Sequence, residues 1–313
     1  MKKLFNPPFE YADFLKKNEI KELLLKSNGL AKIKVALFEG STTSELKNLF
    51  ELFLLHEGYQ PTFYVSDFDR YYEEILFPKE KLIKFNPDLI YIHTTHKNIK
   101  NFPHITNSAS QTNALLEKEI EQYSAIWKAA KKNFSCPIIQ NNFDYPQDRI
   151  LGSFETIHYN GKINYINRLN AAFVKIIFKK EDLFLNDINF LSSKNGLDQW
   201  LDKRLWYSYR YAISFKALPY VAHNLAKIVV SILGSSKKVL ITDLDNTIWG
   251  GIIGDVGMHN ISLGKGDPES EAYLDFQKYL KDLKDAGIVL SVCSKNEENI
   301  AKEGFEHEAS ELK

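Results

Sequence analysis

The stretch Val239-Leu240-Ile241-Thr242-Asp243-Leu244-Asp245-Asn246-Thr247 places an apolar, β-branched run directly before two aspartates. The run at 239–243 is typical of a strand buried in a parallel sheet. Helical spacing follows at 269–286, Gly287 stops that helix, and a second strand is predicted at 288–293. These segments predict an α/β unit whose D-x-D-x-T loop lies at the carboxyl end of a strand, where open α/β sheets bind ligands.

Asp243 and Asp245 stand two residues apart on this loop, a spacing that lets two carboxylates divide the work of group transfer. One faces the substrate as nucleophile while the other supplies or removes a proton. Oxygen ligands favour Mg²⁺ over zinc or copper, with Asp243 and Asp245 as the carboxylate ligands. The alternative is structural, because an Asx-turn with a helix N-cap also accounts for Asp245 and Thr247.

Toward the N-terminus, Gly234-Ser235-Ser236-Lys237-Lys238 is small, polar and typical of a linker, so we expect a domain boundary there. Strand-like and helical segments alternate before it, which predicts a parallel α/β sheet. The predicted strands are 34–38, 62–65, 89–93, 137–140 and 187–191, and the predicted helices are 14–27, 46–54, 71–76, 114–131, 164–178 and 219–233. We expect a helical appendage over 1–30 that ends at Asn28-Gly29, an α/β domain over 31–235, and a second unit over 237–313.

Composition narrows the function classes. The 313 residues contain 40 Lys and Arg against 40 Asp and Glu, so the formal net charge of zero argues against a nucleic-acid or membrane-surface partner. No apolar run approaches the roughly 20 residues that span a bilayer, and no signal peptide is expected. Two cysteines, Cys136 and Cys293, suit a reducing compartment. We therefore expect a cytoplasmic protein.

Two longer runs identify a resemblance. DLDNTIWGGIIGD at 243–255, followed by EAYLDFQKYLKDLKDAGIVLSVCSKNEE at 271–298, resembles the FkbH-like branch of the haloacid dehalogenase superfamily. In that branch a haloacid dehalogenase domain of Rossmannoid fold follows an SGNH hydrolase-like domain, a three-layer α/β/α fold. The resemblance implies Asp243 as nucleophile, Asp245 as general acid/base, and Mg²⁺ as cofactor. It also implies phosphate binding by Ser294, Lys295, Asn246 and Thr247, although a helix N-cap at Asn296 explains the stretch after Ser294 nearly as well.

The same resemblance implies a function. FkbH-like proteins act on a phosphorylated three-carbon acid and load a glyceryl-type acyl unit onto the thiol of an acyl carrier protein, so a carrier protein and a phosphorylated small molecule are the expected partners. Cys293 lies beside Ser294, where it could hold the acyl group as a thioester; the alternative is a small buried apolar residue.

The chain departs from the superfamily pattern in one respect. Residues 297–313 contain neither the lysine of the third motif nor the acidic pair of the fourth. We therefore expect the chain to stop within the haloacid dehalogenase domain, with impaired phosphatase or transferase activity. A second function class is a non-catalytic module that binds the carrier protein.

The N-terminal domain carries a fainter pattern. Glu39-Gly40-Ser41 is placed like the Gly-Asp-Ser block of SGNH hydrolases but lacks its acid, and Asn141 and Asn142 are candidates for the oxyanion-hole asparagine. No D-x-x-H pair supplies a histidine near the end of the domain. An N-cap explains Ser41 equally well. A third function class is therefore an SGNH-type esterase acting through Ser41, and a scaffold is the simpler expectation for this domain.

Overall fold

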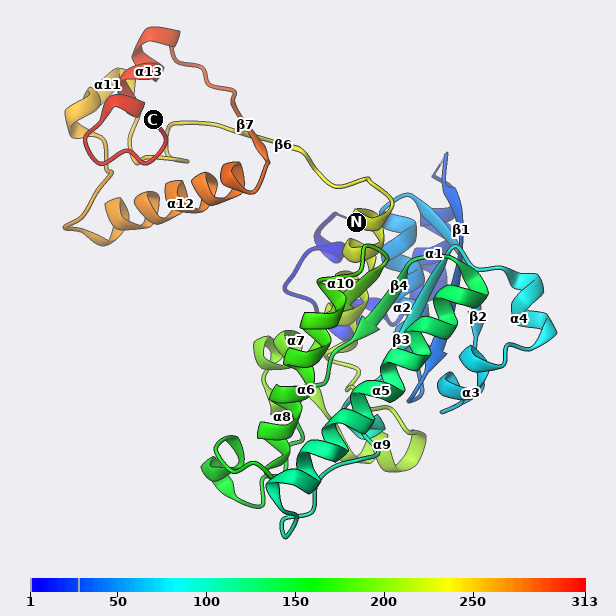
Figure 1. Ribbon diagram of the computed structural model, residues 1–313. Helices are drawn as coiled ribbons and strands as arrows, with labels where there is room; N and C mark the ends of the chain where they lie inside the picture. The colour runs from blue at the N-terminus through cyan, green and yellow to red at the C-terminus, as the bar shows by residue number, and fades with distance from the viewer. Residues whose placement is uncertain (1, 28) are drawn as a thin grey trace. The chain divides into compact units, whose positions relative to one another are not determined.

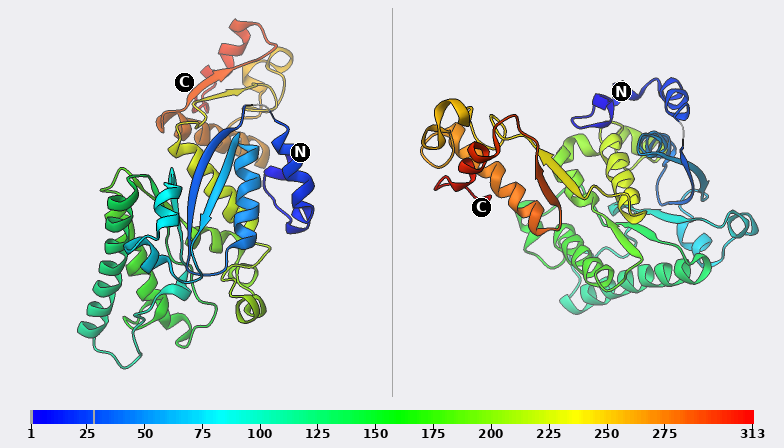
Figure 2. Two further views of the ribbon diagram at one scale, coloured as in Figure 1. Left: turned by 90° about the vertical axis from the view of Figure 1, so that its right-hand side faces the viewer. Right: turned by 90° about the horizontal axis from the view of Figure 1, so that it is seen from above.

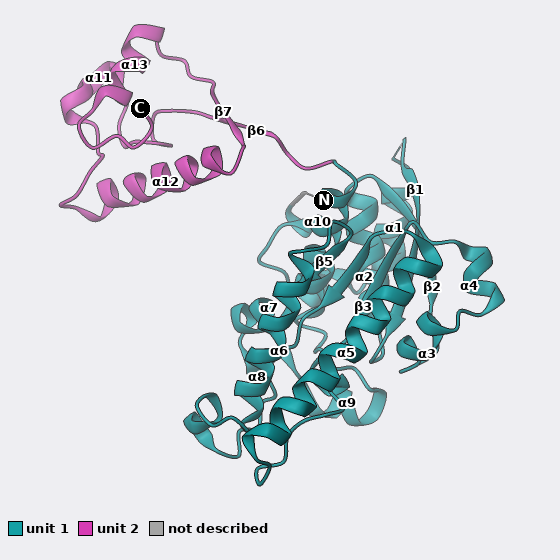
Figure 3. Ribbon diagram, viewed as in Figure 1, with its two compact units in different colours: residues 1–234 teal, residues 235–313 magenta. Residues whose placement is uncertain are grey.

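The computed structural model describes residues 2–27 and 29–313, which form two compact units, 1–234 and 235–313 (Figures 1 and 3). The division falls between Gly234 and Ser235, two residues after the last helix of unit 1 ends at Ile232. Both units combine parallel strands with helices, so the α/β prediction is confirmed.

A five-stranded parallel sheet in the order β2-β1-β3-β4-β5 forms the centre of unit 1. Its strands are β1 (Ala31–Glu39), β2 (Tyr59–Val65), β3 (Leu89–His93), β4 (Ile138–Asn141) and β5 (Leu183–Asn186). In the register between β1 and β3, Glu39 lies opposite His93. The carboxyl ends of these two neighbouring strands therefore meet at one edge of the sheet.

Helices cover both faces of this sheet, as the views in Figure 2 show. On one face lie α1 (Lys17–Leu25), α2 (Ser44–His56), α7 (Ile188–Asn195), α8 (Leu197–Trp200) and α10 (Leu218–Ile232); on the other lie α3 (Tyr71–Leu76), α4 (Glu80–Phe85), α5 (Ala109–Phe134) and α6 (Lys162–Ile177). Alternate residues of β1 point to opposite faces: Val35 and Leu37 join one core, while Ala36 and Phe38 join the other. The result is a three-layer α/β/α arrangement.

One predicted strand is wrong. The last strand of the sheet is Leu183–Asn186, and the segment predicted as strand 187–191 instead begins α7. Asp187 is the N-cap of this helix, because its side chain accepts a hydrogen bond from the backbone N–H of Phe190. The short helix α9 (Lys203–Tyr209) was not predicted either, and none of its residues is buried.

The first 30 residues belong to unit 1. Phe5, Phe9 and Phe14 are buried in the same core as Phe53, and each of their rings is in edge or tilted contact with the rings of Phe53 or Phe14. The expected helix is shorter than 14–27, since α1 spans Lys17–Leu25 after a 3-10 turn at Tyr11–Phe14. Asn28, part of the predicted stop, lies outside the described residues.

Unit 2 contains two parallel strands, β6 (Val239–Thr242) and β7 (Val289–Val292), joined through α12 (Pro268–Asp285). Two further helices, α11 (Ile253–Val256) and α13 (Glu298–Glu306), complete it. Leu240 and Leu290 pack toward α12, whereas Val239, Ile241 and Val289 are half or more exposed. One face of this small sheet is thus open. Throughout residues 2–27 and 29–313, no helix is both long enough and apolar enough to cross a membrane.

Candidate functional site

Asp243 follows the last residue of β6, as the sequence predicts. Its carboxylate is exposed, and Oδ1 accepts a 2.8 Å hydrogen bond from the backbone N–H of Leu244. Leu244 is fully buried, so it anchors the loop beneath the carboxylate. Asp243 therefore presents a carboxylate oxygen to solvent from a fixed point at the carboxyl end of a strand.

Asp245 is held in place by three hydrogen-bond donors. Oδ1 accepts from Trp249 Nε1 at 3.0 Å and from the backbone N–H of Ile253 at 3.1 Å, and Oδ2 accepts from Asn296 Nδ2 at 2.8 Å. These donors come from the residues just after the D-x-D-x-T loop and from the loop that follows β7. Asp245 thus joins the two loops, and its side chain cannot swing freely.

The loop after β7 brings its predicted residues next to the acidic loop. The backbone N–H of Cys293 donates to the carbonyl of Thr242 at 2.9 Å, and Ser294 Oγ accepts from the backbone N–H of Asn296 at 3.2 Å. Lys295 is exposed. The N-cap of α13 is Glu297, so the N-cap role for Asn296 is wrong: its side-chain amide donates to Asp245 instead.

Cys293 is exposed, so the alternative of a small buried residue is wrong. The other cysteine, Cys136, is buried in unit 1, and this burial raises the pKa of its thiol to about 11. Of the two thiols, Cys293 is the accessible one, and it lies on the same loop as Ser294.

Asn246 and Thr247 are used within the loop. Asn246 adopts a positive φ of 53°, and its Oδ1 accepts a 2.9 Å hydrogen bond from the backbone N–H of Gly251. Thr247 Oγ1 lies 3.4 Å from the carbonyl of Asp245. Gly250 pairs with Ser262 in two backbone hydrogen bonds, and a Cβ at this glycine would lie 2.8 Å from the Ser262 side chain. The segment after the acidic loop therefore forms a tight, internally bonded turn.

The acidic loop offers Mg²⁺ one available carboxylate, that of Asp243. Within the described residues, no group of three or more His, Cys, Asp and Glu side chains gathers to form a metal cage. Mg²⁺ is often bound by one or two carboxylates together with water and substrate phosphate, which does not require such a cage. Asp243 fits this role because its carboxylate is exposed, whereas both oxygens of Asp245 already accept hydrogen bonds.

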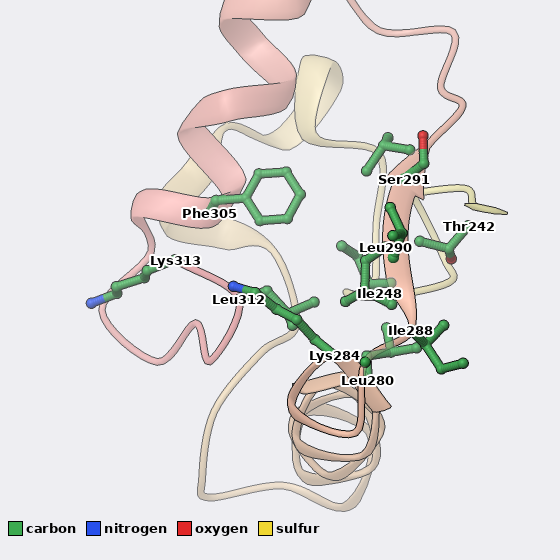
Figure 4. Close-up of a pocket in the computed structure, with 13 residues that line it drawn as sticks. Thr242, Ile248, Leu280, Lys284, Ile288, Leu290, Ser291, Phe305, Leu312 and Lys313 are labelled. Carbon is green, nitrogen blue, oxygen red and sulfur yellow. The ribbon is translucent and has the colours of Figure 1, made fainter. Parts of the chain in front are cut away.

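A mostly apolar cavity of about 550 Å³ lies against β7 (Figure 4). Ile248, Leu290, Phe305 and Leu312 line it, together with Ile288 next to the start of the strand. Neither Asp243 nor Asp245 contributes to its lining. The exposed side chains of Val289 and Val292 also line it, so the cavity is open to solvent and does not lie above the catalytic candidates.

In unit 1, Ser41 contacts a histidine that the sequence motifs did not indicate. Ser41 Oγ lies 3.1 Å from His93 Nε2, and both side chains are buried. The N-cap of α2 is Thr43, so the alternative role of Ser41 as an N-cap is wrong. His93 Nδ1 lies 2.8 Å from the Tyr91 hydroxyl, and burial lowers the pKa of His93 to about 4, so its imidazole is neutral near pH 7.

Asn141 lies next to His93, with its Nδ2 3.3 Å from His93 Nδ1, and the side-chain amides of Asn141 and Asn142 are both bonded within the protein. Asn141 Nδ2 donates to the carbonyl of Thr94 at 3.0 Å, and Asn142 Nδ2 donates to Asp187 at 2.6 Å. Asn141 Oδ1 accepts from the Tyr91 hydroxyl at 3.1 Å. In this structure the two asparagines bind other parts of the protein.

A buried pair of Asp144 and His96 was also not indicated by the sequence motifs. Asp144 Oδ1 lies 3.0 Å from His96 Nδ1, and Trp200 Nε1 donates to its Oδ2 at 2.8 Å. Burial alone would raise the pKa of Asp144, but the charge and hydrogen bonds of His96 and the bond from Trp200 outweigh it, so this pKa lies below its usual range.

The comparison with known families bears on unit 1. The family model described as "FkbH, N-terminal domain" matches residues 34–230. The chain belongs to this family. The match covers the sheet from β1 to β5 and ends within α10, so the Ser41–His93 pair lies inside the FkbH N-terminal domain. No curated protein matches this FkbH-family chain.

A solved structure extends the similarity over both units. The N-terminal part of the protein BF1531 from Bacteroides fragilis, described as containing a phosphatase domain complexed with Mg, is 27% identical to the FkbH-family chain with a TM-score of 0.83; the match covers 95% of this chain and 78% of that chain. An acetyl xylan esterase, AlAXEase, matches at 14% identity and a TM-score of 0.42 over 63% of this chain and 100% of that chain. A GDSL-like lipase from Bacteroides thetaiotaomicron matches at 15% identity and a TM-score of 0.38, and the match covers 71% of this chain and 98% of that chain.

Proposed function

We propose that the Asp243 loop carries out Mg²⁺-dependent phosphoryl chemistry on a phosphorylated three-carbon acid, and that the acyl unit of this acid passes to the thiol of an acyl carrier protein. The observation that carries the proposal is the exposed Asp243 carboxylate beside an Asp245 fixed by three donors. The similarity to a Mg-bound phosphatase-domain protein at a TM-score of 0.83 supports it. The two free cysteines fit a reducing compartment, so we place this chemistry in the cytoplasm.

The phosphoryl step uses residues of both loops. A carboxylate oxygen of Asp243 forms a bond to phosphorus while the bond from phosphorus to the substrate oxygen breaks. Asp245 provides the proton that the departing oxygen takes up and later accepts one from the water that releases phosphate. Ser294 and Lys295 bind the phosphoryl oxygens, and Asn246 and Thr247 keep the loop in shape. Bound Mg²⁺ supplies charge neutralisation for the phosphoryl group.

The acyl step uses Cys293. This step requires that the carboxyl group of the acid be phosphorylated as well, so that an acyl phosphate is present in addition to the phosphate that Asp243 removes. The Cys293 thiolate attacks its acyl carbon, inorganic phosphate leaves, and a thioester forms; the carrier-protein thiol then loses its proton to water, attacks this thioester, and releases the Cys293 thiolate. The exposure of Cys293 on the loop that carries Ser294 supports this assignment, because both the substrate and a protein thiol need access to the sulfur.

The decisive measurement is binding of beryllofluoride, which mimics a phosphoryl group on a carboxylate, followed by ¹⁹F NMR in the presence of Mg²⁺. We expect a bound signal for the unmodified chain, its loss in Asp243→Asn, and its retention in Asp255→Asn, an exposed aspartate of the same unit. Asp245→Asn keeps the nucleophile and should retain binding, while lowering any phosphate release about 10²–10⁴-fold. A bound signal that persists in Asp243→Asn would exclude this loop as the phosphoryl site.

A further inference from the structure

Ser41 and His93 are brought together by the pairing of β1 with β3. Glu39 lies opposite His93 in the register, and Ser41 follows β1 by two residues, so its hydroxyl comes to 3.1 Å from His93 Nε2. When Nδ1 carries the proton and donates it to the Tyr91 oxygen, Nε2 presents a lone pair to the Ser41 hydroxyl. The Tyr91 hydroxyl can then donate to Asn141 Oδ1, as the 3.1 Å distance indicates. The hydrogen bonds therefore fit the arrangement of a nucleophile and a base.

Thr42, the residue after Ser41, is hydrogen-bonded to a segment that lies far along the chain. The backbone N–H of Thr42 donates to the carbonyl of Arg210 at 3.0 Å, and Thr42 Oγ1 donates to the carbonyl of Tyr209 at 2.6 Å. Ser44 Oγ lies 2.5 Å from the Tyr211 hydroxyl. We call residues 203–211 the cover segment. Two of its carbonyl oxygens accept hydrogen bonds from the N–H and the hydroxyl of Thr42, next to Ser41. A substrate carbonyl that reacts with Ser41 needs such donors at the same place.

Besides the three hydrogen bonds above, the cover segment forms an exposed ion pair between Lys203 and Asp148, but it buries little surface. None of the residues of α9 is buried, and Tyr207 and Tyr209 are 72% and 65% exposed. Lys97 Nζ, outside the cover segment, lies 5.1 Å from the ring centre of Trp206, and Arg210 Cζ, within the segment, lies 5.5 Å from it. Arg210 has a positive φ of 61°, a conformation that L-residues rarely adopt. Segments with little buried surface open at a low free-energy cost, so this segment can leave while the sheet stays folded.

We propose that Ser41 and His93 form a nucleophile and base pair for short acyl esters, and that the cover segment closes this site. In the open state Ser41 Oγ attacks the ester carbonyl carbon, its proton passes to His93 Nε2, and the alcohol leaves with that proton. Water then releases the acid by the reverse sequence. The Thr42 N–H, freed from Arg210, donates to the carbonyl oxygen. This site is independent of the Asp243 loop, and its histidine comes from the end of β3 and not from a D-x-x-H pair.

The test uses an alkyl fluorophosphonate, which forms a bond from the serine oxygen to phosphorus and releases fluoride. Two variants should open the cover segment. Trp206→Ala removes the contact with Lys97, and Arg210→Pro cannot keep a positive φ and loses the N–H that donates to the carbonyls of Leu205 and Trp206. Tyr207→Ala, an exposed residue of the same helix, is the matched control. We expect roughly two- to fivefold faster labelling of Ser41 in Trp206→Ala than in the unmodified chain, the size expected from the one cation–π contact that joins Trp206 to a residue outside the cover segment. Tyr207→Ala should label at the unmodified rate.

Labelling should map to Ser41 by mass spectrometry and disappear when Ser41→Ala or His93→Gln is added to Trp206→Ala. Hydrogen exchange at the Thr42 amide reports opening independently and should accelerate in both opened variants. The proposal is overturned if Thr42 exchange accelerates in a variant with unchanged circular dichroism and Ser41 stays unlabelled. It is equally overturned if neither variant accelerates Thr42 exchange, or if the unmodified chain labels as fast as the variants.

Discussion

Asp245 Oδ2 accepts a 2.8 Å hydrogen bond from Asn296 Nδ2, and this bond joins the loop after β6 to the loop after β7. The two residues are 51 positions apart in sequence. Their contact sets the distance between the candidate nucleophile loop and the candidate phosphate-binding residues Ser294 and Lys295. The geometry of the proposed phosphoryl site therefore depends on a side chain that does not itself contact phosphate.

Replacing Asn296 should loosen this site. In Asn296→Ala, Asp245 Oδ2 loses its donor, and we expect unit 2 to lose about 1 kcal/mol in free energy of unfolding, the usual size for one hydrogen bond. Asn296→Asp should cost more, because it places a second carboxylate against Asp245. The free energy of unfolding of both variants can be measured by urea unfolding. Trp249 fluorescence reports on unit 2 when the other tryptophans are replaced. Equal stability of Asn296→Ala and the unmodified chain would mean that the bond contributes nothing.

The two cysteines should differ in reactivity. Cys293 is exposed, whereas Cys136 is buried with a pKa raised to about 11, so iodoacetamide at pH 8 should label Cys293 alone in the folded chain. Intact mass should show one adduct, and Cys293→Ser should show none. In guanidinium chloride both thiols should react. Labelling of Cys136 under native conditions would show that its surroundings open.

Stability should fall on acidification below neutral pH. The pKa of His93 is lowered from 6.5 to about 4 by burial, so between these values the unfolded chain binds a proton that the folded chain does not. The free energy of unfolding should thus decrease as pH falls through this window, by about 3 kcal/mol for His93. Burial also lowers the pKa of His56 and His223, which adds to the slope.

His93→Gln should flatten this pH dependence, and the exposed His104→Gln should leave it unchanged. Below about pH 4 the lowered pKa of Asp144 adds a further loss, because the unfolded chain takes up a proton there first. Midpoints of urea unfolding measured from pH 4 to pH 8 show whether stability decreases on acidification, as predicted. A midpoint that rises on acidification through this range would contradict the assignment.

Gly304→Ala should destabilise unit 2, although alanine favours helices. Gly304 is buried in α13, and an added Cβ would overlap the Trp249 ring, with Cζ3 at 2.7 Å. Overpacking costs about 1–3 kcal/mol, which exceeds the ~1 kcal/mol that alanine gains over glycine in a helix. Glu303→Ala, exposed on the same helix, is the control. A higher unfolding midpoint for Gly304→Ala would mean that the ring moves aside without cost.

Much of the fold follows from local sequence. The predicted strand 89–93 and helix 71–76 coincide with β3 and α3, because a fully buried apolar strand and a short amphipathic helix carry clear periodic signals. The fifth strand was misplaced because Asp187-Ile188-Asn189-Phe190-Leu191 alternates polar and apolar residues like a strand. The hydrogen bond from the backbone N–H of Phe190 to the Asp187 side chain caps a helix here, and the alternation of polar and apolar residues does not reveal this cap.

The candidate sites were predictable only in part. Asp243 and Asp245 follow an apolar strand and could be placed from sequence, but the partner of Asp245 could not, since Asn296 reaches it only through the pairing of β6 with β7. The contact of Ser41 with His93 likewise depends on strand register. His93 carries no local motif, so only the order of the sheet brings it to the serine.

The open face of the β6–β7 sheet has a thermodynamic consequence. Val239, Ile241 and Val289 are 52%, 66% and 60% exposed before any unfolding takes place. The heat capacity increment of unfolding arises mainly from apolar surface that becomes hydrated, and it is about 12–15 cal/mol/K per residue in ordinary domains. Because part of this surface is hydrated already, unit 2 should unfold with a smaller increment per residue than unit 1. Its stability should therefore change more gradually with temperature, so that warming affects the two units of one chain unequally.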